Sequence, residues 1–203
     1  MLRHRWPVIV LGLTAAAGSI ADHFGAFGAL GPDRQRYDRA VATITHVVDG
    51  DTYDIDIPDS GRNSTRVRLL GVDCPEVSHG DGDTDAYFGR DAAKWTESEV
   101  AGKRVKIVLD PTRPVRDKHG RLLAYLFVAD DGVACEKTSL NQQLIDQGLA
   151  FADWRFEHVH ELRYERAERL AVRAKTGMWK GMTRERMPQW RQEMMNENRD
   201  SRR

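Results

Sequence analysis

Hydrophobic and polar residues alternate in the first part of the chain in a pattern that predicts short β-strands. Tyr53, Ile55 and Ile57 alternate strictly with Asp54 and Asp56. A period of two residues places the first set against a core and the second set in water. The β-branched and alternating runs on either side complete a predicted meander of three strands at 41–48, 52–57 and 65–70, with turns at 49–51 and 58–61.

Farther along the chain the spacing of apolar residues changes to the period of a helix. Helices are predicted at 88–100, 139–145 and 160–175, and strands at 105–109 and 122–128. The apolar stripe predicted for the last helix consists of Leu162, Ala167, Leu170, Ala171 and Ala174. Five short strands with helices between and after them predict an α+β fold, a five-stranded OB-type β-barrel with about three helices.

The N-terminal residues have the order of an export signal. A positive head at 3–5 precedes an uncharged run at 6–17, and small residues lead to the cleavage motif Ser19-x-Ala21. The uncharged stretch is shorter than the ~20 apolar residues of a comfortable membrane span. We expect a cleaved signal peptide, with an uncleaved membrane anchor through residues 6–21 or a buried helix as the alternatives. Either of the first two places an exported domain in the periplasm or outside the cell.

The predicted organisation has four parts: a signal peptide or membrane anchor at 1–21, a linker at 22–39, the barrel domain at 40–181 and a flexible polar tail at 182–203. We expect a monomer. The two cysteines are Cys74 and Cys135, and an exported protein can pair them, but the sequence does not show whether they come close enough.

The distribution of charged residues along the chain is more informative about function than the net charge. Lys+Arg and Asp+Glu balance at 31 each, so the net charge gives no indication of nucleic-acid binding. Acidic residues nevertheless predominate at 49–59 and 73–85, and basic residues at 111–121 and 161–203.

Four acidic residues lie at strand ends that the meander can bring to one rim of the barrel: Asp49, Asp51, Asp73 and Glu76. Gathered together they would repel one another unless a cation lies among them, and hard oxygen ligands favour Ca²⁺ or Mg²⁺. Acidic residues are also good turn formers, so their spacing alone leaves metal binding open.

Two arginines follow the same segments. Arg68 lies on the strand that leads to Asp73, and Arg121 follows the basic loop. A pair of guanidinium groups can bind a phosphodiester and neutralise charge that develops during phosphoryl transfer. The alternative is that each arginine forms an ordinary surface salt bridge.

Three blocks of sequence, in order, resemble the signature blocks of the staphylococcal nuclease-like family. They are Val48-Asp49-Gly50-Asp51-Thr52, the run from Arg68 to Glu76 (RLLGVDCPE) and the run from Asp117 to Tyr125 (DKHGRLLAY). The resemblance continues through Asn141 to Gly177-Met178-Trp179 and covers roughly residues 42–180.

The resemblance implies a calcium-dependent nuclease that cleaves DNA, and in our expectation also RNA, to 3′-phosphate products. It implies that Asp51, Asp73 and the backbone carbonyl of Cys74 bind Ca²⁺, and that Asp49 supports the site through water. It further implies that Glu76 is the general base and that Arg68 and Arg121 bind the scissile phosphate. Lys118, Trp154 and Phe156 are the residues that it places at the substrate.

The sequence departs from the family at three points. Cys74 stands where the family commonly has Thr, and Trp154 and Phe156 stand where it has two tyrosines. An acidic loop from Ser78 to Asp85 replaces a lysine-bearing one, which should weaken long-range attraction to nucleic acid. Two rival functions are a non-catalytic binding module for nucleic acid or protein on the same barrel, and a surface-anchored adhesion or structural protein.

Overall fold

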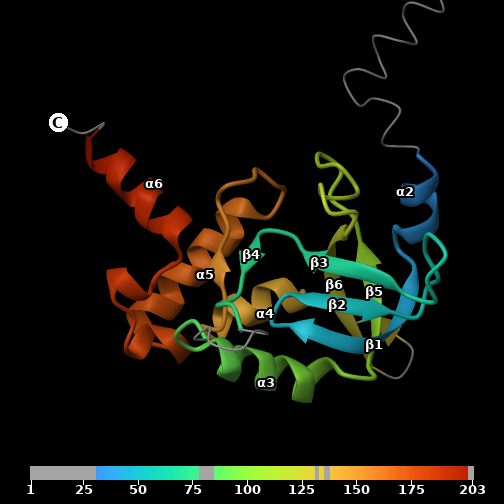
Figure 1. Ribbon diagram of the computed structural model, residues 1–203, viewed down its shortest axis with the longest axis horizontal. Coiled ribbons are helices and arrows are strands. Elements are labelled where there is room, and N and C mark those ends of the chain that lie inside the picture. The colour runs from blue at the N-terminus through green and yellow to red at the C-terminus, as the bar shows by residue number, and fades with distance from the viewer. Residues whose placement is uncertain (1–30, 78–84, 131–132, 135–137, 201–203) are drawn as a thin grey trace, which may run out of the picture.

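The computed structural model describes residues 31–77, 85–130, 133–134 and 138–200, and five of its strands close into a barrel (Figure 1). These strands are β1 (Val41–Asp49), β2 (Thr52–Ile55), β3 (Thr65–Leu69), β5 (Arg104–Val108) and β6 (Leu122–Asp130). Antiparallel pairs connect them in the order β3-β2-β1-β5-β6, and a parallel pairing of β3 with β6 closes the sheet. The predicted α+β fold with an OB-type barrel is therefore confirmed.

The barrel core follows from the alternation along its strands. Tyr53 and Ile55 of β2 are fully buried, whereas Asp54 is half-buried and Asp56 is exposed. Because every strand turns one face inward, removal of these apolar side chains from water stabilises the closed sheet.

Short strands and helices complete the domain around one end of the barrel (Figure 1). Strand β4 (Val72–Asp73) pairs with β8 (Phe151–Ala152), and β7 (Val133–Ala134) pairs antiparallel with the end of β6. The helices are α3 (Gly89–Val100), α4 (Leu140–Asp146) and α5 (Glu161–Ala174), followed by the 3₁₀ turns η2 (Gly177–Lys180) and η3 (Arg184–Arg186).

Two further helices lie outside the predicted limits of the domain, so the expected number of about three was too low. Helix α2 (Pro32–Tyr37) lies inside the predicted linker, and helix α6 (Gln189–Asp200) inside the predicted flexible tail. Tyr37 is fully buried with its hydroxyl 3.1 Å from Thr65 Oγ1, and Arg191 of α6 is only 7% exposed. Both segments are ordered because they bury side chains against the domain, which their polar composition did not reveal.

The buried face of α5 also differs from the prediction. Leu162 and Leu170 are 79% and 56% exposed, whereas the buried residues are Tyr164, Ala167, Glu168 and Ala171. Glu168 lies on this face because its carboxylate accepts a hydrogen bond from the Ala152 amide at 3.0 Å and pairs with Arg191. A paired and hydrogen-bonded charge can be buried, and a hydrophobicity pattern does not anticipate one.

Asn141 of α4 connects the end of β3 to β6. Its side-chain amide donates to the carbonyls of Leu70 and Ala124 at 2.9 and 3.2 Å and accepts from the Leu126 amide at 3.2 Å. The side chain is fully buried, so these three bonds satisfy main-chain groups that water cannot reach.

Several expectations concern residues outside the described part of the chain. The predicted signal or anchor at 1–21, the acidic loop from residue 78 to 84 and Cys135 all belong to this group. Within the described ranges, no helix is long and apolar enough to cross a membrane.

His158 fixes the loop that follows β8. The side chain is 8% exposed, its Nδ1 lies 3.1 Å from the hydroxyl of Tyr125, and burial lowers its pKa from the usual 6.5 to about 4. Between these two pH values the unfolded chain binds a proton at this histidine and the folded chain does not.

We therefore expect the stability contributed by neutral His158 to be complete above pH 6.5 and to be lost as the pH falls toward 4. The loss should be roughly 3 kcal/mol over this window, and His158→Gln should flatten that slope. Urea unfolding at intervals between pH 7 and pH 4 measures it. Parallel pH curves for the wild type and the variant would contradict the assignment.

Candidate active site

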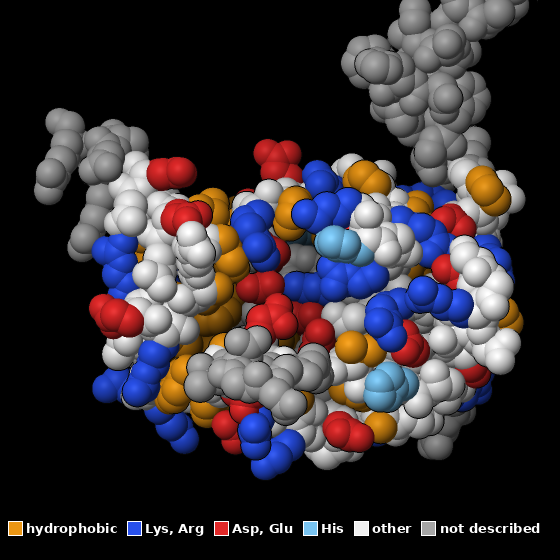
Figure 2. Space-filling model, viewed as in Figure 1, with side chains coloured by type: hydrophobic (Ala, Val, Ile, Leu, Met, Phe, Trp, Pro, Cys, Tyr) orange, Lys and Arg blue, Asp and Glu red, His pale blue; other side chains and the backbone are white. Residues whose placement is uncertain are grey.

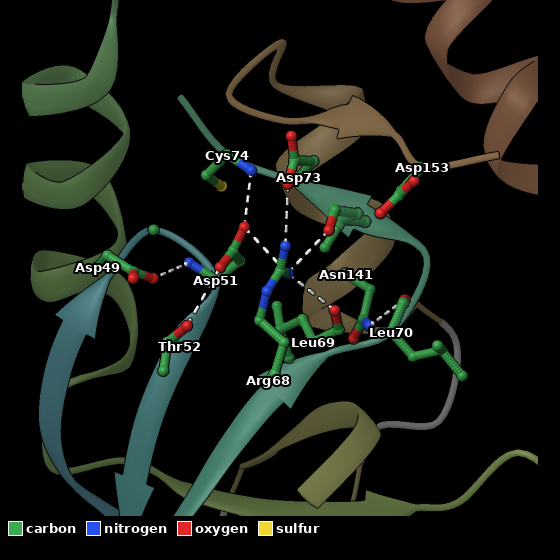
Figure 3. A network of polar contacts seen from close by, with 12 residues as sticks. Asp49, Asp51, Thr52, Arg68, Leu69, Leu70, Asp73, Cys74, Asn141 and Asp153 are labelled. Carbon is green, nitrogen blue, oxygen red and sulfur yellow. Dashed lines mark hydrogen bonds and ion pairs between the residues drawn. The ribbon is translucent and has the colours of Figure 1, made fainter. Parts of the chain in front are cut away.

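The guanidinium group of Arg68 lies between the carboxylates of Asp51 and Asp73 (Figure 3). It is 3.0 Å from Asp51 Oδ2 and 3.0 Å from Asp73 Oδ1. It also donates to the carbonyls of Leu69 and Val72 at 3.0 and 2.8 Å. Burial opposes the charge of Arg68, and the nearby carboxylates outweigh that effect, so its pKa is raised. Three of the predicted site residues thus meet in one network.

The register of the meander brings these residues together. Thr52 pairs with Asp49 on β1 and with Arg68 on β3, so the ends of three strands lie side by side. Strand β4 then returns Asp73 to the same place, where it pairs with Phe151 of β8. The site therefore occupies one rim of the barrel, as the positions of the turns predicted.

Asp51 is the most buried acid of the site, with 5% exposure. Its carboxylate accepts hydrogen bonds from the Cys74 amide at 2.7 Å and from the Thr52 hydroxyl at 3.3 Å. Asp49 Oδ1 accepts from the Asp51 amide at 3.0 Å. Burial, together with the charges of Asp49 and Asp73, raises the pKa of Asp51 to about 8. The charged form of Asp51 therefore requires more neutralisation than Arg68 provides.

Gly50 allows the turn to approach Cys74. A Cβ atom on Gly50 would lie 2.8 Å from both Cβ and Sγ of Cys74, closer than such atoms come in proteins. The Gly50 carbonyl accepts a hydrogen bond from the Tyr53 hydroxyl at 2.6 Å, which fixes the turn. Cys74 is a buried free cysteine, and burial raises the pKa of its thiol well above the usual range, so the thiol is neutral.

Glu76 is exposed, and its backbone lies against the first residue of α3. Its backbone carbonyl accepts from the Ala86 amide at 3.0 Å, and Gly89 makes room for this carbonyl, which a Cβ there would meet at 2.5 Å. Desolvation, followed by the charges of Asp49 and Asp73, raises the pKa of Glu76, while Arg68 and Arg121 lower it. Glu76 therefore lies within the electrostatic reach of all four charged groups.

Arg121 is held by Asp117 at the edge of the site. Its Nε lies 2.7 Å from Asp117 Oδ2, and its amide donates to Asp117 Oδ1 at 2.9 Å. The side chain is 31% exposed and contacts neither Asp51 nor Asp73. Lys118 is exposed nearby in sequence. The contacts with Asp117 thus fix the orientation of the Arg121 side chain, which remains partly exposed and within electrostatic reach of Glu76.

The two predicted substrate aromatics have different surroundings. Phe156 is 47% exposed, with the guanidinium groups of Arg113 and Arg155 each 5.8 Å from its ring centroid. Trp154 is partly buried and its ring contacts Trp190 and the guanidinium of Arg191. Phe156 is therefore available for stacking, whereas Trp154 already packs against the C-terminal helix.

Two residues that contact Asp73, Arg155 and Trp190, were not identified from the sequence. Arg155 Nη2 lies 3.2 Å from Asp73 Oδ1 and 2.8 Å from Asp153 Oδ2, and Trp190 Nε1 donates to Asp73 Oδ2 at 2.9 Å. No local signal could have found them, because their contacts with Asp73 are between residues far apart in the chain.

The chemistry of the donors suits a hard cation. In the part of the chain that the structure describes, no three side chains of His, Cys, Asp or Glu are grouped as metal ligands. Asp51 is buried and Asp73 is half-buried, and their carboxylates lie on either side of the Arg68 charge, with the main chain of Cys74 adjacent. Carboxylate and carbonyl oxygens with added water are the ligands that Ca²⁺ takes, so these residues fit calcium.

Acidic and basic side chains are sorted on the surface around this site. Figure 2 shows Asp and Glu side chains gathered in the middle of one face, with Lys and Arg side chains beside them. Next to Arg121 a groove of about 520 Å³ is lined by Asp33, Asp59, Ser60, Arg62, Ser64, Arg66, Arg116, His119, Gly120 and Arg121.

Comparison with known proteins gives a family match over more than half of the chain. A family model described as staphylococcal nuclease homologue matches residues 66–181. The matched segment contains Arg68, Asp73, Glu76 and Arg121. Asp49 and Asp51 precede it, and helix α6 follows it.

Two relatives illustrate the extent of the similarity. The thermonuclease of Staphylococcus intermedius is 31% identical over 137 residues, which cover 67% of this chain and 74% of that protein. Endonuclease YncB of Bacillus subtilis is 31% identical over 143 residues, which cover 66% of this chain and 62% of that protein.

The contact between Gly50 and Cys74 gives a test of how the site is built. Gly50→Ala should lower the free energy of unfolding by about 1–3 kcal/mol, because the added methyl group overpacks the turn. Cys74→Gly removes both clashing atoms, so the double variant should lose less stability than the sum of the single variants. Urea unfolding of the wild type, the two single variants and the double variant measures this coupling. Additive losses in the free energy of unfolding would show that the two residues do not clash.

Proposed function

This chain belongs to the staphylococcal nuclease family, and we propose that it is a calcium-dependent nuclease that cleaves DNA or RNA to 3′-phosphate products. The observation that carries the proposal is the network of Asp51, Arg68 and Asp73, with Glu76 and Arg121 beside it. Carboxylates that can bind a metal ion, next to arginines that can bind a phosphate, are the arrangement that metal-assisted phosphoryl transfer uses.

Asp51, Asp73 and the carbonyl of Cys74 are the proposed calcium ligands, with Asp49 supporting the site through water. The raised pKa of Asp51 supports this assignment, because a buried carboxylate that is incompletely neutralised favours a bound cation. When bound, Ca²⁺ would supply positive charge that polarises the phosphodiester and the attacking water.

Glu76 and the two arginines have separate parts in the proposed reaction. Glu76 accepts a proton from a water molecule, whose oxygen forms the new bond to phosphorus. The bond from phosphorus to the 5′-oxygen breaks, and this oxygen leaves with the electron pair and takes up a proton from solvent. Arg68 and Arg121 bind the phosphate oxygens, where negative charge is greatest in the transition state. Arg68 must exchange its carboxylate partners for the phosphate, since it contacts Asp51 and Asp73 in this structure.

The groove beside Arg121 is the proposed path of the nucleic-acid strand. Arg66 and Arg116 in its wall are paired with Asp54 and with Asp33 and Asp59, respectively, so they contribute less net charge. Arg62 is exposed and lines the same groove. A strand bound at Arg121 could therefore place a neighbouring phosphate against Arg62.

Export and quaternary state are further parts of this proposal. Residues 1–21 carry the pattern of a secretory signal or membrane tether, and we propose that the domain acts outside the cytoplasm as a monomer.

Digestion of single-stranded DNA and RNA by the full chain, with Ca²⁺, with Mg²⁺ and with a chelator, tests the proposed reaction. We expect cleavage in Ca²⁺ to 3′-phosphate ends and its loss in chelator. Glu76→Gln should lower kcat about 100-fold or more by removing the base, and Arg121→Ala should lower it about 100- to 1,000-fold.

Glu99→Gln and Arg104→Ala are matched controls, since both residues are exposed on other elements. A folded protein that binds nucleic acid but cuts none with any metal would instead be the non-catalytic binding module.

Arg62 tests the path of the strand. Arg62→Ala should raise KM for a long single strand with kcat unchanged, because the residue binds substrate away from the reacting phosphate. Binding should also depend less on salt. The slope of log K against log salt should become shallower by about one, as expected for the loss of one phosphate contact. Steady-state kinetics and binding titrations at several salt concentrations measure both effects. An unchanged KM and salt slope would place the strand elsewhere.

A further inference from the structure

The C-terminal helix α6 reaches the acidic network from outside the segment that matches the family. The family match ends at residue 181, and α6 begins at Gln189. Trp190 in its first turn is half-buried, and its indole Nε1 donates to Asp73 Oδ2 at 2.9 Å. A residue beyond the family domain thus contacts a proposed calcium ligand directly.

A buried ion pair anchors the helix in this position. Arg191 donates to both carboxylate oxygens of Glu168 on α5, at 2.9 and 2.6 Å, and each side chain is 8% exposed. Glu168 also accepts from the amide of Ala152 on β8, and β8 pairs with β4, which carries Asp73. The contacts therefore form a closed ring through α6, α5, β8 and β4 that fixes Trp190 relative to Asp73.

The ring of Trp190 is held on two further sides. The guanidinium of Arg155 lies 4.4 Å from its centroid, and the ring of Trp154 meets it edge to face at a centroid distance of 6.3 Å. Because these neighbours limit rotation of the indole, the direction of its N–H group is defined by packing rather than by the hydrogen bond alone.

The two oxygens of Asp73 have different partners. Oδ1 accepts from Arg68 and Arg155, and Arg68 connects this oxygen to Asp51. Oδ2 accepts from Trp190. The indole therefore holds Oδ2, and Oδ1 is the oxygen that Arg68 connects to Asp51. Hydrogen bonds of this kind orient metal ligands, and their loss weakens metal binding.

We propose that Trp190 is a positioning residue for the cation site, and that its indole N–H fixes the orientation of the Asp73 carboxylate. The inference rests on the proposed calcium site and adds a residue from outside the family domain to it. A contact that instead competed with the cation would have the opposite effect, since its removal would tighten calcium binding.

The test is calcium titration by calorimetry of the full chain without nucleic acid. Trp190→Phe keeps an aromatic ring and removes the N–H donor, and it should weaken calcium binding about 10-fold. Trp190→His should restore part of the affinity, because Nε2 of the imidazole takes the place of the indole Nε1. In digestion assays Trp190→Phe should raise the calcium concentration for half-maximal rate and leave KM for DNA unchanged.

Trp179→Phe is the matched control. Its Nε1 is buried without a hydrogen-bond partner among the described residues, so the substitution removes an indole N–H but no bond to the site. Calcium affinity should be unchanged in this variant, and urea unfolding confirms that each protein is folded.

The outcomes separate this inference from the proposed function. A wild type that binds calcium and cleaves, beside a folded Trp190→Phe with equal or tighter calcium affinity, overturns the role of Trp190 alone. A folded wild type that neither binds calcium nor cleaves overturns the proposed nuclease and this inference with it.

Discussion

Carboxylates that share a buried region repel one another, and in this protein the charge of Arg68 lies between two of them. Its contacts with Asp51 and Asp73, both 3.0 Å long, join the turn after β1 to strand β4. Burial raises the pKa of Asp51, the Arg68 guanidinium lowers it, and the charges of Asp49 and Asp73 raise it further. The acidic rim therefore lies against arginine charge, and the proposed cation and phosphate sites are inferred from this arrangement.

Main-chain geometry in the barrel fixes the relative positions of these charged residues. The register of β1, β2 and β3 fixes Asp49, Asp51 and Arg68 relative to one another, and the Cys74 amide binds the Asp51 carboxylate. Main-chain register and hydrogen bonds therefore fix where the acidic side chains begin, while the proposed reaction requires Arg68 to change partners. Glu76 and Arg121 lie on the more exposed side of the network, where substrate and water can reach them.

The C-terminal helix makes the site larger than the family domain. Trp190 contacts Asp73, and Arg191 is held by the buried carboxylate of Glu168. Loss of this ion pair would leave a buried charge without a partner, so helix, α5 and β8 are expected to remain associated as a unit. The acidic network is therefore in contact with a segment more than a hundred residues away in the chain.

The sequence by itself determined the barrel, because alternation and turns are local signals, and it identified Asp49, Asp51, Arg68 and Asp73 as residues of one rim. The proximity of Asp51, Arg68 and Asp73 followed from turn positions in the meander and from the family blocks. Only the tertiary structure decided the buried face of α5, the order of α2 and α6, and the contacts of Arg155 and Trp190 with Asp73. These depend on partners distant in the chain: Glu168 is buried because Arg191 neutralises it, and no hydrophobicity pattern records a charge that is buried in a pair.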